Sequence, residues 1–516
     1  MAEVSQEKQL ILDWIDDHAT HLGELCDQLW EYSEPALREY RSARDLCQYL
    51  RSYGFEVEEG ISGMPTAFVA TYGRGRPIVA TYAEYDATPG QSQKPVPYQE
   101  PVVPFAAGFT DAHHVLGVSA CVSAVAAARA KDRFKLPGTI KVFGTPAEKI
   151  GVGKPYMARD GYYDEVDAFL TWHPGHTSHN YNTTSLNRAS GAFYQVLISY
   201  LCREPWKWSG LGGLAGVRHP GALEGVTLFY TLSKYMRDHM LPRHGGWSIS
   251  EFIMTGGQAT ADNWPPDIAQ IYLSFRSPEL KLLDIMLERL KEVASAAARA
   301  TYTDVDFRIV TKVRTGVPNA SLGHLMYRNL ELAGPPKFSE DEKEFAREMM
   351  ANFGYEPLDE PFNEELTPPE EVERQVLASM PPAQRHRGGD DSSEMGWHAP
   401  MGRLMVCGNA LRTIPGRDYP IWMEGALCGT TSVHKMGVVA AKTIACSMVE
   451  LMADPTALSE AQAEWRDRTK DRLIPPLLPE GLNPPINARF PEWVDNRYPK
   501  EPPRNLKWST PPFPPD

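Results

Sequence analysis

The spacing of apolar residues predicts helices at the start of the chain and a sheet beyond them. Over residues 10–53 apolar side chains recur at helical spacing, with a break at 33–35. A helix rich in small residues is expected between 111 and 130. Short apolar runs typical of strands lie at 66–72, 77–82, 139–143 and 168–172. Helices that alternate with such strands predict an α/β domain, with a mixed, mostly parallel sheet flanked by helices.

A different pattern begins near residue 189 and predicts a second, inserted domain. Two apolar runs are typical of strands, at 191–200 and 269–275, and amphipathic helices are expected at 223–240 and 280–300. The main domain then resumes, and its stretch 338–376 is acidic and loop-rich, as expected of a surface cover. The predicted organisation is a main domain in two parts, 1–189 and 313–455, an inserted domain at 190–312, and an extension at 456–516.

The extension is dense in proline from residue 473 to the end. Proline fits neither a helix interior nor a central strand, so we expect an extended tail on the surface. Phe490, Trp493 and Trp508 would hold it there, and disorder of the last ten residues is the alternative.

Composition narrows the class of protein. The chain has 516 residues, is 42% hydrophobic and 23% charged, and carries a formal net charge of -14. This acidity argues against nucleic acid or an anionic membrane as a partner. There is no run of 18 apolar residues, and the first 32 residues lack the basic and apolar regions of a signal peptide, so a cytoplasmic location is expected. The seven cysteines are scattered singly, as expected of buried free thiols in a reducing compartment.

Several segments carry residue types that bind a divalent metal. Asp111 and His113 lie two apart in a loop before the small-residue helix, and His173 ends a strand before a Pro-Gly turn. His434 lies where small residues lead into a helix. Each alone has an ordinary explanation, such as an accidental pair, a surface turn or a capping histidine. Together, on one α/β sheet whose strand ends gather functional residues, they indicate a metal site.

A fourth segment places Glu148 and Lys149 directly after a strand. A glutamate beside a metal is a suitable general base, whereas an ammonium has three donors and no acceptor and is no ligand. The ordinary explanation of this pair is a solvated ion pair. If the pair faces the metal site, the role of Lys149 becomes the main question about this chain.

The chain resembles the M20 family of metallopeptidases, in the amidohydrolase branch that cleaves N-acyl amino acids and within it the p-aminobenzoyl-glutamate hydrolase subgroup. The similarity covers roughly residues 10–455. The resemblance implies a catalytic α/β domain with an inserted ferredoxin-like lid that usually forms a homodimer. The stretches that carry it are 84–90, 138–148, 151–154, 157, 161, 166–174, 255–257, 275–278, 433–435 and 440–442.

The chain departs from the family pattern at its metal site. The family motif GHxCGHN is matched by residues 108–114, where Asp111 replaces the bridging Cys, His113 is retained and Phe109 replaces a histidine. The family Glu-Glu pair, a general base followed by a metal ligand, is Glu148-Lys149 here. The resemblance assigns the two remaining ligand positions to His173 and His434. The histidine of the family lid has no counterpart in the stretch 206–214, and His219 is the only nearby candidate.

These departures predict one divalent metal, Zn or Mn, held by Asp111, His113 and His173. A second ion would keep only His434 and a share of Asp111, and an ammonium at 4 Å would repel a unit charge by about 4 kcal/mol at an effective dielectric of 20. Lys149 therefore disfavours the second ion. It could take over that ion's electrostatic role, act as a base or nucleophile with a lowered pKa, or turn away to solvent.

The predicted function is hydrolysis of an amide C–N bond in a small N-acyl amino acid or a related carboxylate-bearing amide. Glu148 is the expected general base, and Lys149 helps to hold the oxyanion or a substrate carboxylate. Two alternatives remain: a non-hydrolytic C–N step such as amide formation or cyclisation, and a binding protein without catalysis. The candidate substrate-binding residues are Arg276, His114, Trp206 and Trp208.

Overall fold

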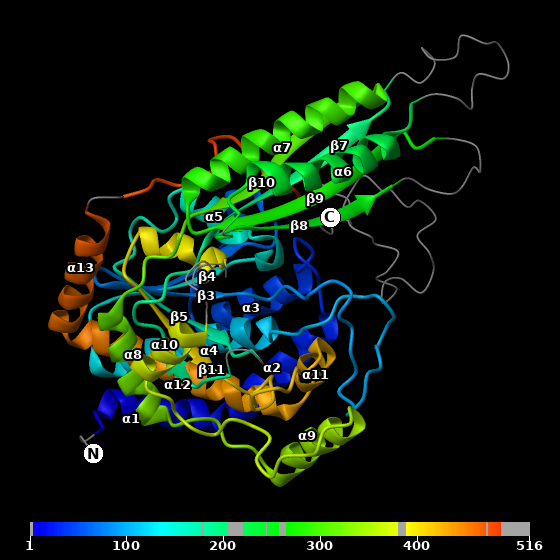
Figure 1. Cartoon of the computed structure of the whole chain (residues 1–516). Coiled ribbons are helices and arrows are strands. Elements are labelled where there is room, and N and C mark those ends of the chain that lie inside the picture. The colour runs from blue at the N-terminus through cyan, green and yellow to red at the C-terminus, as the bar shows by residue number, and fades with distance from the viewer. Residues whose placement is uncertain are drawn as a thin grey trace, which may run out of the picture.

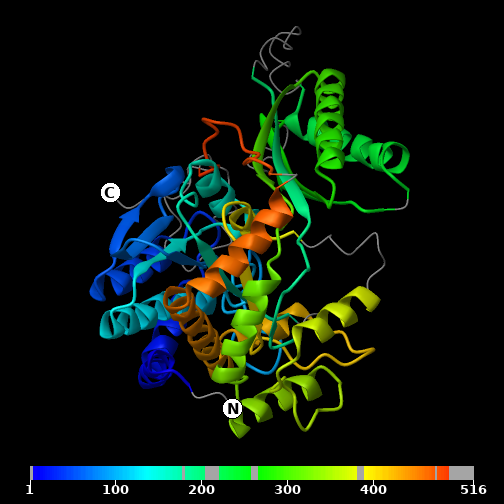
Figure 2. The ribbon, with the colours of Figure 1, turned by 90° about the vertical axis from the view of Figure 1, so that its left-hand side faces the viewer.

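The computed structural model describes most of the chain, and its elements form a larger sheet-and-helix body with a smaller one beside it (Figure 1). The turned view separates the two, with the smaller body at the top right (Figure 2). The described residues are 4–176, 180–203, 220–243, 245–256, 265–379, 389–470 and 473–486.

The larger body is built on a seven-stranded sheet of order β1-β2-β4-β3-β5-β11-β6. The central pairs β4–β3, β3–β5 and β5–β11 are parallel, whereas β1, β2 and β6 join antiparallel. The predicted mixed sheet with a mostly parallel centre is therefore confirmed. The strands are β1 (Glu56–Glu59), β2 (Phe68–Arg74), β3 (Ile78–Ala83), β4 (Gly138–Gly144), β5 (Ala168–Pro174), β6 (Thr183–Thr184) and β11 (Met401–Val406).

Helices cover this sheet, and two of them form its central packing layer. These are α4 (His113–Phe134), whose small residues are almost all buried, and α12 (Thr431–Ala453), which packs against it. Gly117 lets α4 lie close against the residue that follows β3, because a Cβ at this position would lie 2.6 Å from the carbonyl oxygen of Glu84. The other helices of this body are α1 (Gln6–Asp17), α2 (Ala19–Tyr32), α3 (Tyr40–Ser52), α5 (Gly153–Arg159), α8 (Ala320–Ala333), α11 (Ile421–Leu427) and α13 (Pro455–Thr469).

Helix α12 is, among the described helices, the one long and apolar enough to cross a membrane by length and composition. Of its most apolar stretch, 78% is buried inside the protein. The apolar character of α12 is accounted for by its place between α1, α4 and α8.

The smaller body is an antiparallel sheet of order β10-β7-β9-β8 with α6 and α7 packed on it and an apolar core of its own. This is the strand and helix content expected of a ferredoxin-like insertion, while its role as a lid stays a prediction. The apolar pattern indicated β7, β9 and both helices but not β8 or β10. The elements are β7 (Ala192–Leu201), α6 (Ala222–Met240), β8 (Ser248–Thr255), β9 (Ile268–Ser277), α7 (Leu280–Thr301) and β10 (Asp304–Val313).

The stretch 338–376 differs from the loop-rich cover that was predicted. It contains helix α9 (Glu340–Asn352) and most of helix α10 (Pro369–Ser379). The Ser339 side chain accepts from the backbone N–H of Glu342, whose carboxylate accepts from the backbone N–H of Ser339, so a capping box begins α9. The high charge of this stretch reflects solvent-facing helices rather than loops.

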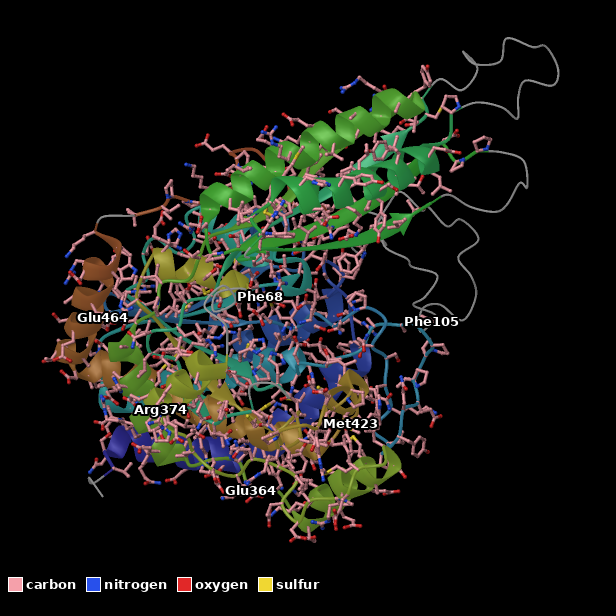
Figure 3. The ribbon with its side chains drawn as sticks, viewed as in Figure 1. Phe68, Phe105, Glu364, Arg374, Met423 and Glu464 are labelled. Carbon is pink, nitrogen blue, oxygen red and sulfur yellow. The ribbon has the colours of Figure 1, made fainter. Side chains whose placement is uncertain are left out.

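The segment 473–486 has no helix or strand and is held to the surface through its carbonyl oxygens. Arg314 Nη1 donates to Ile474 O at 2.6 Å, and Arg308 Nη2 donates to Asn483 O at 3.2 Å. Phe490, Trp493 and Trp508, predicted to anchor the tail, lie outside the described residues. Side chains fill both bodies, and Phe105 points outward at one edge of the larger one (Figure 3).

Candidate active site

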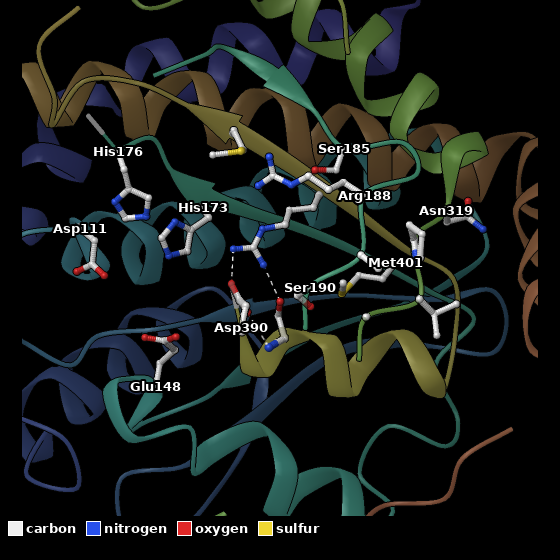
Figure 4. Close-up of a pocket in the computed structure, with 18 residues that line it drawn as sticks. Asp111, Glu148, His173, His176, Ser185, Arg188, Ser190, Asn319, Asp390 and Met401 are labelled. Atoms are coloured by element: carbon white, nitrogen blue, oxygen red, sulfur yellow. Dashed lines mark hydrogen bonds and ion pairs between the residues drawn. The ribbon is translucent and has the colours of Figure 1, made fainter. Parts of the chain in front are cut away.

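Charged and imidazole side chains meet where the central strands of the larger sheet end. Glu84 follows β3, Glu148 and Lys149 follow β4, and His173 lies near the end of β5. Asp111 and His113 reach the same place from the start of α4. This is the carboxyl edge at which open α/β sheets place their ligands, and Figure 4 shows Asp111, Glu148 and His173 on one side of a pocket.

His113 is the centre of the cluster and is fully buried. Its Nδ1 lies 2.8 Å from Asp86 Oδ1, and its Nε2 lies 3.2 Å from both Glu84 Oε2 and Asp111 Oδ2. Burial lowers the pKa of His113, but the carboxylates of Asp111 and Glu84 outweigh it and hold the pKa well above the usual value. Asp86 fixes the ring, so Nε2 is the nitrogen that faces the other cluster residues.

Lys149 points into the cluster rather than to solvent. Its Nζ donates to Asp111 Oδ2 at 2.5 Å and lies 3.3 Å from Glu148 Oε2 and 3.1 Å from His113 Nε2. Its backbone N–H donates to Asp86 Oδ2 at 2.9 Å. Burial lowers the pKa of Lys149, but the charges of Asp111 and Glu148 raise it by more than burial lowers it. The pKa therefore lies above its ordinary value. The two carboxylates favour the ammonium form, and the side chain does not adopt the solvent-facing conformer considered from the sequence.

A second buried lysine lies behind the first. Lys154 Nζ donates to Glu84 Oε1 and to Asp391 Oδ1, each at 2.5 Å, and all three side chains are buried. Burial raises the pKa of Glu84 and of Asp391 although Lys154 opposes it. One ammonium therefore does not neutralise the two carboxyl groups in this dry environment.

His173 has the protonation state of a ligand. Its Nδ1 lies 2.9 Å from Pro174 O, which can only accept, so Nδ1 carries the proton and Nε2 keeps its lone pair. Burial lowers the pKa of His173 well below the usual value, and the charge of Arg403 lowers it further. Its ring stands edge-on to that of His113 at 5.7 Å between centroids.

The side chains fit a divalent cation. Two groups of potential ligands share His113: one with Glu84 and His173, the other with Asp111 and Glu148. The buried oxygen Glu84 Oε2 accepts no hydrogen bond from any described residue. In and beside the cluster lie six carboxylates, from Glu84, Asp86, Asp111, Glu148, Asp390 and Asp391, and three permanent cations, Lys149, Lys154 and Arg403. The histidine and carboxyl donors of the cluster suit such an ion.

Two predicted site residues are placed elsewhere. His434 Nε2 lies 2.8 Å from Asp27 Oδ1 of α2, and His434 belongs to neither group of potential ligands among the described residues. His114, expected to bind substrate, is buried with its Nε2 3.0 Å from Cys428 O, and burial, followed by the charge of His434, lowers its pKa to about 3. His114 therefore faces the protein interior.

A pocket of about 340 Å³ adjoins the cluster and is reached by Glu148, Asp111 and His173. Arg276, the predicted substrate-binding arginine, does not line it; its guanidinium lies over the Phe193 ring at 5.7 Å from the ring centre. Trp206, Trp208 and His219 lie outside the described residues. Two arginines that the sequence did not indicate, Arg188 and Arg403, do line this pocket.

Sequence reasoning also missed Glu84, Asp86, Lys154, Asp390 and Asp391 as site residues. Glu84 and Asp86 carried an available signal, because two acids directly after an apolar run mark the end of a strand at the edge where ligands bind. Asp390 and Asp391 carried none, since only the fold brings them beside Lys154 and Arg403.

Comparisons with known proteins agree with this geometry. No protein-family model matches the chain. Over 503 residues it is 27% identical to one of the subunits of the p-aminobenzoyl-glutamate hydrolase of Escherichia coli K12, covering 92% of this chain and 98% of that protein. It is 26% identical to the Xaa-Arg dipeptidase of Mus musculus, over 66% of this chain and 74% of that protein.

A solved structure extends the likeness to the fold. The aminobenzoyl-glutamate utilization protein from Klebsiella pneumoniae superimposes with a TM-score of 0.52 at 13% identity, covering 84% of this chain and 98% of that one. The relatives, the mixed sheet and the metal-ligating residue types at its carboxyl edge lead to one conclusion. The chain is a hydrolase that acts on amide C–N bonds, as its relatives do.

Proposed function

We propose that this protein hydrolyses the amide bond of a small N-acyl amino acid or a related carboxylate-bearing amide, with Glu148 as general base. The observation that carries the proposal is the position of Glu148. Its carboxylate lines the pocket, while its Oε2 lies 3.8 Å from His113 Nε2 in the buried cluster. A base at this boundary can meet both a substrate and a water molecule activated by the cluster.

Glu84, His113 and His173 would hold at most one divalent ion, Zn or Mn, with Asp111 adjoining. Such an ion polarises a carbonyl group and makes water more acidic when it is bound. The second group of potential ligands, Asp111, His113 and Glu148, surrounds the Lys149 ammonium. Lys149 thereby supplies positive charge where a second ion would lie, which supports a site for one metal.

Glu148 and Lys149 have different roles in this proposal: one transfers the proton and the other supplies charge. Glu148 accepts a proton from the attacking water and passes it to the leaving nitrogen, as one carboxylate can do in successive steps. Lys149 keeps its proton, holds Asp111 and Glu148 in place, and presents its charge to the oxyanion that develops on the substrate carbonyl.

The substrate class follows from the pocket and from the relatives. A cavity of about 340 Å³ admits a small molecule rather than a protein chain. The Escherichia coli relative is named for p-aminobenzoyl-glutamate, an N-acyl amino acid. We further propose that the protein acts in the cytoplasm as a homodimer whose two chains contact each other through their smaller bodies.

Metal content and activity test this function together. We expect about one Zn or Mn per chain by elemental analysis, and cleavage of N-acyl amino acids that is lost on chelation and restored by the metal. Glu148→Gln should lower kcat by about 100-fold or more while the metal content is kept. Turnover of these compounds without metal would favour a non-hydrolytic C–N reaction, and two ions per chain would contradict the role given to Lys149.

A further inference from the structure

We propose that Arg188 is the carboxylate-binding residue of the pocket, so that the substrate's free carboxylate lies at its Arg188 end. The inference rests on the proposed function, because it assigns the substrate class to that same site. The pocket runs from Asp111, Glu148 and His173 to Arg188, Ser185 and Ser190. Figure 4 shows Arg188 extending into this pocket across from Asp390. The reacting groups therefore lie on one side of the pocket, and an arginine lies farther along it.

The two arginines of the pocket differ in their partners. Arg403 is neutralised, since it donates to Asp390 Oδ2 and to Ser392 Oγ, at 2.5 and 2.6 Å. The Arg188 guanidinium makes no ion pair with any carboxylate in the described part of the chain, although it lies in a pocket with several. Partial burial lowers the pKa of Arg188 and the like charge of Arg403 lowers it further, yet the guanidinium stays charged. A charged guanidinium without a carboxylate partner attracts an anion.

An acid beside Arg188 is already engaged by the backbone. Glu373 of α10 accepts from the backbone N–H groups of Leu186, Asn187 and Arg188, at 3.0, 2.5 and 3.1 Å. This clasp fixes the loop that carries Arg188 while the guanidinium remains available. An arginine on a fixed backbone can bind a planar carboxylate with two parallel hydrogen bonds without the loop having to be ordered.

The remaining walls describe the rest of the ligand. Met401, Met405, Val317 and Pro318 add apolar surface to the pocket. An acid with an apolar or aromatic acyl part satisfies both these walls and Arg188. An N-acyl amino acid has that composition, with its amide bond between the acyl group and the carboxylate.

Binding to a catalytically impaired protein tests this assignment apart from catalysis. We would measure the Kd of N-benzoylleucine and N-benzoylglutamate by calorimetry on full-length Glu148→Gln, and of the analogues in which every carboxylate is a carboxamide. Adding Arg188→Met should weaken the acids about 10- to 100-fold and leave the carboxamides within about twofold. Arg188→Lys, which keeps the charge but loses the planar fork, should fall in between. Arg374→Met, a change at an exposed arginine of α10, is the matched control and should alter neither (Figure 3).

Each outcome decides one question. An equal loss of affinity for acids and carboxamides, or no loss of affinity, would show that Arg188 does not bind the carboxylate. Failure of both acids to bind would overturn the substrate class. If the acids bind through Arg188 but the wild-type protein with Zn or Mn does not cleave them, the proposed hydrolysis fails and the Arg188 assignment stands.

Discussion

At the scale of single residues, Lys149 is the main departure of this chain from the metallopeptidase pattern that it resembles. The resemblance identified the position as a lost metal ligand, and the structure shows what replaces it: an ammonium within 3.3 Å of Asp111, His113 and Glu148. A buried charge persists only when it is paired, and here the carboxylates of Asp111 and Glu148 pair it. Lys149 is therefore a part of the cluster that contacts its other residues directly.

Restoring a carboxylate at position 149 should restore a second metal. Lys149→Glu removes the ammonium and adds a ligand beside Asp111, His113 and Glu148, so we expect bound Zn or Mn to rise from at most one to about two ions per chain. Elemental analysis after equilibrium dialysis measures this. Lys149→Met is the control, because it removes the charge without adding a ligand and should not gain an ion. A Lys149→Glu protein with unchanged metal content would show that Lys149 does not occupy a metal position.

Sequence reasoning found the residues that the family motif contains and missed those that only the fold assembles. Asp111, His113, Glu148 and His173 were identified from short motifs, and the structure brings them together. Arg188 has no local signal, since its loop is fixed by Glu373, 185 positions later in the chain. His434 matched the motif, but its ring is hydrogen-bonded to Asp27 of a different helix.

At the scale of elements, the apolar pattern predicted strands that are largely buried and missed a strand that is not. It indicated β3, β4 and β5, which are buried on both sides, and missed β8, whose residues are all half-buried or exposed. A strand with little burial has no apolar pattern to read. Helix α9 was missed because its charges dominate its composition, although the capping box at Ser339 marks its start.

Glu39, at the start of α3, joins this helix to the loop that carries Glu148 and Lys149. Its carboxyl group accepts from Ala147 N at 2.8 Å and from Thr66 Oγ1 at 2.9 Å. Burial, followed by the charge of Asp86, raises its pKa from 4.5 to about 8. The folded protein thus holds a proton that the unfolded chain releases, so the contribution of this group to stability falls as pH rises from 4.5 towards 8.

Glu39→Gln should remove that pH dependence while keeping an acceptor for Ala147. We expect the variant to gain stability relative to wild type as pH rises from 5 to 8, measured by urea unfolding across this range. Thr66→Ser, which retains the hydroxyl donor to Glu39, should follow the wild-type pH dependence. A difference between Glu39→Gln and wild type that is flat with pH would mean that Glu39 is ionised in the folded protein.

At the scale of the whole molecule, the smaller body leaves apolar surface uncovered on one side. Strand β8 is an edge of its sheet, and Phe252 and Ile253 on it are 55% and 51% exposed. On the neighbouring α6, Tyr235 and Met240 are 60% and 61% exposed. An edge strand with exposed apolar side chains is suited to pairing with another chain, and a second copy of this protein offers the same surface in return.

The predicted homodimer should therefore depend on β8. We expect light scattering behind size-exclusion chromatography to give twice the mass of one chain, and Ile253→Lys to shift the protein to the monomer because a charge would be buried at the paired edge. Phe105→Lys is the control, since this side chain is 74% exposed but lies on the larger body (Figure 3). A wild-type monomer would contradict the dimer, and a dimer that survives Ile253→Lys would place its interface elsewhere. Because the Arg188 pocket is lined by residues of the larger body and its connections to the smaller one, the Ile253→Lys monomer should still bind N-benzoylleucine within a few fold of the dimer.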